Sequence, residues 1–249
     1  MLKKFSLILI AVLMFAACED EATRKINEIE NDKNKDSLEL DFLGLSEFPE
    51  SIGNLTNLEF LSLGYNRLKY VPESIGNLKN LKTLWLNQNQ LTSVPKSIGN
   101  LTVLEQLSFG DNPLGSFPEC ITKLTKLKTL ELWGNQIKSV PECIGNLTNL
   151  STLSFEQNQL TSLPDSFCKL AKLEDLCLMH NQLTKLPECI GNLKKLKNLD
   201  LYNNQLTVLP ESIGYLTNLE LLILGKNNFS GAEEAKIIAL LPNCKILWE

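Results

Sequence analysis

Hydrophobic and polar residues follow one repeating pattern along most of this 249-residue chain, with a period of 23 residues. Each unit has leucine eight and five positions before an asparagine, and leucine or phenylalanine three positions before it. Such a strict period predicts a solenoid, in which every unit is one small supersecondary structure. The asparagines that mark the period are Asn66, Asn89, Asn112, Asn135, Asn158, Asn181, Asn204 and Asn227.

The two halves of the unit predict different local structures. In the first half, two apolar residues separated by one polar residue, such as Leu61 and Leu63, fit a short strand with one buried face. In the second half, a proline followed three residues later by an apolar residue, as in Pro72 and Ile75, fits a single helical or 3₁₀ turn. A strand this short cannot bury its apolar face alone, so neighbouring units must stack.

We expect the repeated asparagines to be structural. The bend after each strand turns backbone N–H and C=O groups inward, away from water, and such groups need partners. A side-chain amide offers both a donor and an acceptor. Stacked asparagine side chains are therefore predicted to form a ladder through the core.

The unit L-x-x-L-x-L-x-x-N-x-L, with a second half such as Val140-Pro141-Glu142-Cys143-Ile144-Gly145, resembles the 23-residue class of the leucine-rich repeat family. The resemblance covers about residues 38–249 and implies an α/β solenoid of horseshoe shape. It implies a parallel sheet on the concave face, short helical or 3₁₀ turns on the convex face, and binding of proteins without catalytic residues. Similar repeats occur in many bacterial proteins and in eukaryotic scaffolds of Ras signalling.

The two ends of the predicted domain, residues 37–249, depart from the pattern. The first unit has Leu43 in place of asparagine, as expected of a terminal unit with one neighbour. At the other end, from about residue 230, Ser230 and Glu233 match a capping box and predict a true amphipathic helix that stops before Pro242. A last short strand is predicted over residues 245–248.

The N-terminal residues resemble a targeting signal. Residues 1–17 combine Lys3 and Lys4 with a short apolar run, which predicts a signal peptide. The sequence Phe15-Ala16-Ala17-Cys18 resembles the lipobox of bacterial lipoproteins, which implies lipidation of Cys18 and an outer-membrane lipoprotein facing the periplasm or the cell surface. A cleaved, secreted form is the alternative. Residues 18–36 lack aromatic residues and are predicted to be a flexible tether.

Charge argues against nucleic acid as a partner. The chain has 24 basic and 29 acidic residues, and removal of Lys3 and Lys4 with the signal peptide leaves 22 against 29, a net charge of −7. Nucleic-acid binding needs a basic surface. We expect a monomer with no cofactor, which meets the membrane only through its lipid anchor.

Three cysteines, Cys120, Cys143 and Cys189, occupy a column that is otherwise filled by serine. Neighbouring strands lie about 4.8 Å apart, and a disulfide needs Cα atoms roughly 4.4–6.8 Å apart. A Cys120–Cys143 disulfide is therefore one hypothesis. The alternative is that cysteine replaces serine as another small residue.

Residues that flank the core leucines of each strand are expected to point onto the concave face. These variable positions contain five acids but one full base, Lys226, together with several aromatic residues. Exposed aromatic residues anchor many interfaces, whereas the alternative is a solvated surface of incidental composition. The predicted partner-binding residues are Trp85, Glu131, Trp133, Glu156, Asp175, Met179, His180, Asp200 and Tyr202.

Catalytic and metal-binding interpretations are disfavoured. Cys177, His180 and Asp200 are close in the repeat and suggest a nucleophile, but a regular sheet offers no pocket to serve it. With Asp175, they lack the spacing of a known metal site. We therefore predict an envelope-anchored module, not an enzyme, that binds a protein or peptide. The alternatives are an intracellular-type signalling scaffold and a structural envelope protein without a specific ligand.

Overall fold

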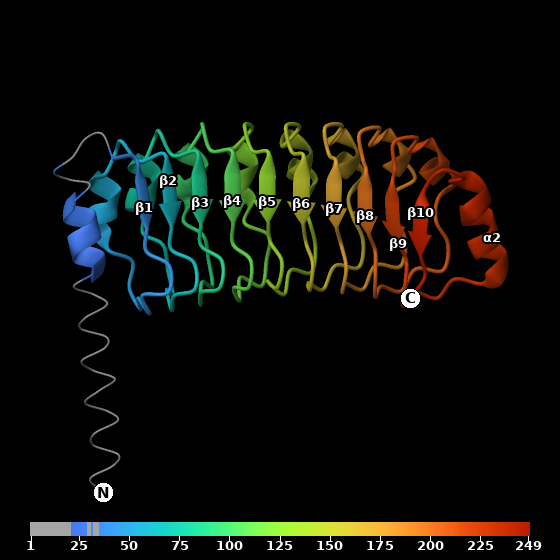
Figure 1. Ribbon diagram of the computed structural model, residues 1–249, viewed down its shortest axis with the longest axis horizontal. Helices are drawn as coiled ribbons and strands as arrows, with labels where there is room; N and C mark the ends of the chain where they lie inside the picture. The colour runs from blue at the N-terminus through green and yellow to red at the C-terminus, as the bar shows by residue number, and fades with distance from the viewer. Residues whose placement is uncertain (1–20, 29–30, 32–34) are drawn as a thin grey trace, which may run out of the picture.

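The repeats form one continuous stack in the computed structural model, which describes residues 21–28, 31 and 35–249 (Figure 1). Over the last of these ranges, ten parallel strands pair in sequence order. From β1 to β9, equivalent residues of neighbouring units pair with each other, so that Phe60 pairs with Thr83 and Trp85 with Ser108. The predicted solenoid fold is confirmed. The strands are β1 (Ser37–Glu39), β2 (Phe60–Ser62), β3 (Thr83–Trp85), β4 (Gln106–Ser108), β5 (Thr129–Glu131), β6 (Thr152–Ser154), β7 (Asp175–Cys177), β8 (Asn198–Asp200), β9 (Leu221–Ile223) and β10 (Lys245–Leu247).

Short 3₁₀ helices lie behind the sheet and begin after the repeated prolines (Figure 1). Pro72, for example, has an extended backbone before the helix that buries Ile75. A Cβ atom on Gly76 would approach the Ser97 Cβ atom of the next unit to 2.6 Å, so the close stacking of turns requires glycine there. The 3₁₀ helices are Glu50–Asn54, Glu73–Asn77, Lys96–Asn100, Glu119–Lys123, Glu142–Asn146, Asp165–Lys169, Ile190–Asn192 and Glu211–Tyr215.

The hydrophobic core runs the length of the stack between these two layers. Columns of leucine, such as Leu61, Leu84 and Leu107, are fully buried between strand and turn. Burying one such side chain contributes about 1.5–3 kcal/mol. Because every unit supplies the same set, stability is spread along the stack, and the side chains on the solvent side of the sheet are left free to vary.

The asparagine ladder closes the bend after each strand. The Asn89 Oδ1 atom accepts a hydrogen bond from Leu68 N–H of the preceding unit at 2.9 Å. Its Nδ2 atom donates to the carbonyl oxygens of Leu63 at 2.9 Å and Leu86 at 3.1 Å. Equivalent bonds occur at Asn66, Asn112, Asn158, Asn181, Asn204 and Asn227.

The ladder has a fault at Asn135. The Nδ2 atom of Asn135 donates to Phe109 and Trp133 carbonyl oxygens at 3.0 and 2.8 Å. Its buried Oδ1 atom has no hydrogen-bond partner among the described residues. In the other units this oxygen accepts from the N–H group two residues after the preceding asparagine. Here that residue is Leu114, which lies between Pro113 and Gly115, and Gly115 has a left-handed backbone with φ of +69°. The Gly115 N–H group donates to the Asn135 carbonyl oxygen instead.

The C-terminal end is closed as predicted. Ser230 caps the N-terminus of helix α2 (Gly231–Leu240), and its hydroxyl oxygen accepts a hydrogen bond from Glu233 N–H at 3.2 Å. The Glu233 carboxylate accepts from Leu209 N–H of the preceding unit at 3.1 Å, which ties the helix to the stack. Beyond it, β10 pairs with β9, and the Trp248 ring packs edge-on against Phe229.

The N-terminal end differs from the prediction. Residues 21–28 form a helix beside the first unit, so the predicted flexible tether (18–36) is wrong for these residues (Figure 1). Ala22 and Ile26 lie one helical turn apart and join the buried core near Phe48. Lys25 donates to the Glu39 carbonyl oxygen at 3.0 Å. An apolar pair four residues apart thus covers the open end of the core.

The predicted signal peptide, residues 1–17, and the predicted lipidation site, Cys18, lie outside the described residues. In the ranges that are described, no helix combines the length and apolar character needed to cross a bilayer.

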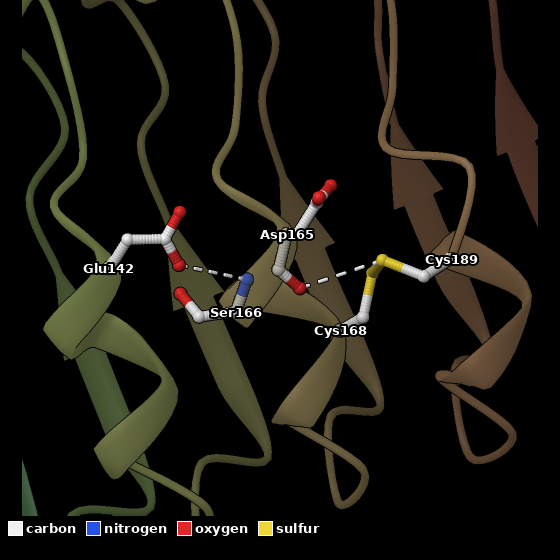
Figure 2. Close-up of a disulfide and its surroundings, with 5 residues drawn as sticks. All are labelled: Glu142, Asp165, Ser166, Cys168 and Cys189. Atoms are coloured by element: carbon white, nitrogen blue, oxygen red, sulfur yellow. Dashed lines mark hydrogen bonds between the residues drawn. A yellow bond between two sulfur atoms is a disulfide. The ribbon is translucent and has the colours of Figure 1, made fainter.

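The disulfide hypothesis is wrong in its pairing. Cys120 and Cys143 are both free, and a disulfide joins Cys168 to Cys189 on the turn side of the stack (Figure 2). The Cα atoms of the bonded pair are 5.8 Å apart and 21 residues separate them in sequence. The Cys189 sulfur also lies 3.5 Å from the Asp165 carbonyl oxygen. The bond therefore links the 3₁₀ helix Asp165–Lys169 to the residue that directly precedes the next 3₁₀ helix, Ile190–Asn192.

The stacking of the turns explains why Cys120 and Cys143 do not pair. The glycine that follows the buried isoleucine in most units faces the serine column of the next unit, as Gly53 faces Ser74. Cys120 likewise faces Gly99, which has no side chain to bond. Cys168 occupies the glycine column and Cys189 the serine column one unit later, so these two side chains meet.

Candidate functional site

The solvent side of the sheet, called the sheet face below, carries the variable residues that were predicted to bind a partner. Strand pairing places Ser62, Trp85, Ser108 and Glu131 in one row across β2 to β5. Equivalent residues of neighbouring units thus lie side by side, and each row changes character along the stack. The N-terminal and C-terminal halves of this face differ in what their side chains contact.

The N-terminal half contains a hollow of about 380 Å³, named the tryptophan hollow here. It includes three of the predicted residues: Trp85 from one unit, and Glu131 and Trp133 from another. Trp85 is 38% exposed and packs edge-on against Phe60, with ring centroids 5.2 Å apart. The hollow is lined by Asp41, Tyr65, Trp85, Asn87, Gln106, Leu107, Ser108, Thr129, Glu131 and Trp133.

Small residues set the shape of the tryptophan hollow. A Cβ atom on Gly110 would overlap the indole of Trp133, so this ring lies back over the preceding unit. Replacing Gly110 by any larger residue would push the indole away. Ser108 is buried between the rows, and its Oγ atom has no hydrogen-bond partner among the described residues. This hydroxyl oxygen is closed to solvent, so a ligand in the hollow does not reach it.

Two carboxylates give the tryptophan hollow a negative charge. Asp41 is held in place because one of its oxygens accepts hydrogen bonds from Ser62 Oγ and from Gly64 N–H. Glu131 is half-buried on β5. None of the described lining residues is lysine, arginine or histidine. The charge is therefore left for a ligand to neutralise.

Exposed aromatic side chains continue from the hollow toward the N-terminal end. Phe42 is 70% exposed and stacks on Tyr65, with ring centroids 4.2 Å apart. Both residues have positive φ angles, which aim their side chains away from the ladder. Exposed aromatic groups of this kind contribute strongly to protein interfaces.

The C-terminal half of the sheet face is occupied by contacts among its own side chains. His180 Nδ1 lies 2.6 Å from Asn203 Nδ2, and the His180 ring packs edge-on against Tyr202. The Lys226 ammonium lies 5.2 Å from the centre of the Tyr202 ring. The predicted residues His180 and Tyr202 are thus brought together, but as a satisfied cluster.

The remaining predicted residues follow the same trend. Asp175 accepts a hydrogen bond from Asn198 Nδ2 at 2.6 Å, and Asp200 accepts from Tyr202 N–H at 2.9 Å. Glu156 and Met179 are half-buried and do not line the tryptophan hollow. Met179 belongs to the same unit as His180.

The geometry gives no support to a nucleophile at Cys177. Burial raises the pKa of the Cys177 thiol to about 11, and the nearby Asp200 and Glu156 carboxylates add to this effect. The reactive thiolate is therefore scarce at neutral pH. His180 contacts Asn203 through Nδ1. Within the described residues, no group of three or more histidine, cysteine or acidic side chains is placed to hold a metal.

The first unit contributes to this site, which was not predicted from the sequence. Asp41 stands one unit before Gly64 in the same row, and Phe42 stands one unit before Tyr65. Extending the rows across the first unit would have found both residues. The first unit lacks the asparagine, as expected of a terminal unit, yet its strand supplies the same outward positions.

Known protein families match this chain through its repeat. A family model described as a leucine-rich repeat region matches residues 1–116 and 115–182, and a model of two leucine-rich repeat copies matches residues 171–211. The chain belongs to the leucine-rich repeat family. No curated protein matches this leucine-rich repeat chain.

Several solved leucine-rich repeat structures are similar to it. A leucine-rich repeat protein of Leptospira interrogans is 35% identical with a TM-score of 0.61, over 86% of this chain and 72% of that one. An internalin of Listeria monocytogenes is 28% identical with a TM-score of 0.75, over 85% and 60%. A plant peptide hormone receptor, RGFR1, solved in complex with RGF2, is 34% identical with a TM-score of 0.75, over 85% and 35%. The chain thus spans about a third of the length of that receptor structure.

Proposed function

We propose that this chain is a lipid-anchored leucine-rich repeat protein of a bacterial envelope that binds a protein or peptide on its sheet face. The observation that carries the proposal is the tryptophan hollow, which is lined by two indoles and two carboxylates. A rigid surface of this kind limits the ordering cost of binding.

The similar structures support the same class of function. RGFR1 was solved with RGF2, and HAESA, another similar plant receptor, was solved with the peptide hormone IDA and a co-receptor. The Listeria and Leptospira proteins have the same fold in bacteria. Membrane attachment rests on the lipobox-like sequence before Cys18.

Partner binding is tested by chemical cross-linking on cells that carry the full-length chain, compared with a Trp85→Ala/Trp133→Ala/Tyr202→Ala variant. We expect the cross-linked partner to disappear in the variant, with circular dichroism unchanged. If the variant keeps every partner, the sheet face is not the binding site. A complete lack of partners for the wild-type chain would favour a purely structural envelope protein.

The lipid anchor has its own test. Labelled palmitate should be incorporated into the wild-type chain and should be absent from a Cys18→Ala variant. Equal labelling of both chains, or labelling of neither, would contradict the anchor and favour a secreted protein or an intracellular scaffold.

A further inference from the structure

We propose that the tryptophan hollow recognises an arginine side chain of the partner. The inference rests on the proposed function, because it names the chemistry that the same surface selects. It depends on three features of the hollow: its charge, its aromatic walls and its polar lining.

The charge selects a cation. Asp41 and Glu131 line the hollow, and the described lining residues include no base. The Asp41 carboxylate is fixed by Ser62 and Gly64, so one of its oxygens is held while the other is free to accept from a ligand. A phosphate or carboxylate group of a partner would be repelled by both acids.

The walls favour a flat cation. Trp85 and Trp133 line the hollow, and tryptophan is the best aromatic partner for a cation. A guanidinium group is planar and more weakly hydrated than an ammonium group, so it stacks on indole at a lower desolvation cost than lysine does. These walls therefore favour arginine over lysine.

The acceptors fit the five N–H donors of a guanidinium group. Besides the two carboxylates, the Asn87 and Gln106 side chains line the hollow, and their amide oxygens can accept hydrogen bonds. A neutral side chain of similar shape would leave the carboxylates unneutralised. The hollow thus has both the shape and the charge to distinguish arginine from its uncharged analogue.

The test uses three synthetic pentapeptides, Gly-Gly-X-Gly-Gly, in which X is arginine, lysine or citrulline, a neutral analogue of arginine. Each is titrated into the full-length protein in detergent while the indole N–H resonances of Trp85 and Trp133 are followed by NMR. We expect the arginine peptide to bind about tenfold more tightly than the citrulline peptide, equal to about 1.4 kcal/mol, with lysine between them.

Variants make the test specific. Glu131→Gln should reduce the arginine-to-citrulline ratio to near one, whereas Glu156→Gln, on the same face but outside the hollow, should leave it unchanged. Equal binding of arginine and citrulline peptides, an unchanged ratio in Glu131→Gln, or no binding of the arginine peptide would each overturn the inference.

Failure of this inference is distinguishable from failure of the proposed function. If a partner cross-links to the wild-type chain but not to the Trp85/Trp133/Tyr202 variant, and the arginine peptide neither binds nor competes, the binding function stands and the arginine assignment fails. If the variant keeps its partner, the binding function itself fails.

Discussion

The two halves of the sheet face are built on the same backbone but differ in how their side chains are used. In the N-terminal half, Trp85, Ser108 and Glu131 line a hollow whose negative charge is not neutralised by a base in its described lining. In the C-terminal half, His180 and Tyr202 contact each other and their neighbours. A repeating frame therefore offers equivalent positions along its length, and the choice of side chains decides which of them remain open to a ligand.

The leucine core and the asparagine ladder should stabilise both halves equally. The largest expected effect is the loss of stability when one ladder asparagine is removed. Asn89→Ala and Asn181→Ala each remove one acceptor and the donors of one buried amide. Unsatisfied buried groups cost about 1–3 kcal/mol each, so we expect each variant to lose about 3 kcal/mol of unfolding free energy. Urea denaturation measures this loss.

Two controls bound this prediction. Asn77→Ala removes an exposed side chain of a 3₁₀ helix and should leave stability unchanged. Asn135→Ala should cost less than Asn89→Ala, because the Asn135 Oδ1 atom already lacks a partner. A large difference between the Asn89 and Asn181 variants would mean that the halves differ in their frame as well as in their faces.

The disulfide is a reinforcement of the C-terminal half. Cys168→Ser/Cys189→Ser should lower the unfolding free energy by about 3 kcal/mol, as expected for a loop closed across 21 residues. Reducing agent should lower the stability of the wild-type chain in the same way. Cys120→Ser/Cys143→Ser is the matched control and should change little, because both thiols are free. Equal losses in the two double variants would argue against the observed pairing.

Partner affinity should separate the two halves of the sheet face. Trp85→Ala/Trp133→Ala should weaken binding of the cross-linked partner by roughly 30-fold, equal to about 2 kcal/mol, because buried aromatic anchors dominate interfaces. His180→Ala/Tyr202→Ala should change it by less than about threefold, since these side chains already contact each other. Surface plasmon resonance measures both effects, and the reverse order would move the binding site to the C-terminal half.

The smallest effect concerns Asp200. Burial raises the pKa of its carboxyl above the ordinary value, although the Tyr202 N–H hydrogen bond acts in the opposite direction. A raised pKa means that the folded state favours the protonated form, so stability is greatest below the unfolded pKa and falls as pH rises through the folded pKa. Asp200→Asn should therefore raise the unfolding midpoint by about 1 °C at pH 7 and leave it unchanged at pH 3. A variant that is less stable at pH 7 would contradict this sign.

The sequence was sufficient for the frame because the frame is local and periodic. Residues equivalent to Leu61, Asn66 and Pro72 occur at the same position of every full repeat. Each such position has the same surroundings in every unit, so its role can be predicted from the repeat pattern. The disulfide required a further step. Cys168 stands in the glycine column, and contact between this column and the next unit's serine column is a property of how turns stack. The separation of 21 residues between Cys168 and Cys189 is two less than the period, and it is the sequence signal for this pairing.

The candidate site was only partly predictable. The register identified Trp85 and Trp133 as outward-facing, but not that the Trp133 indole lies back over Gly110, which depends on the side-chain conformation. The N-terminal helix was missed because Ala22 and Ile26 are isolated apolar residues in a polar segment. Their burial depends on contact with the open end of the core near Phe48, which is distant in sequence but close in space.

The Cys168–Cys189 bond also determines how the stack yields under tension. A solenoid pulled from its ends unravels one unit at a time, because each unit contacts only its neighbours. The segment between the bonded cysteines, residues 169–188, cannot extend, so the fully stretched chain is shorter by roughly 65 Å than the reduced one. In an oxidising compartment the protein is thus a shorter and stronger link between whatever holds its N-terminal end and a load applied near its C-terminal end.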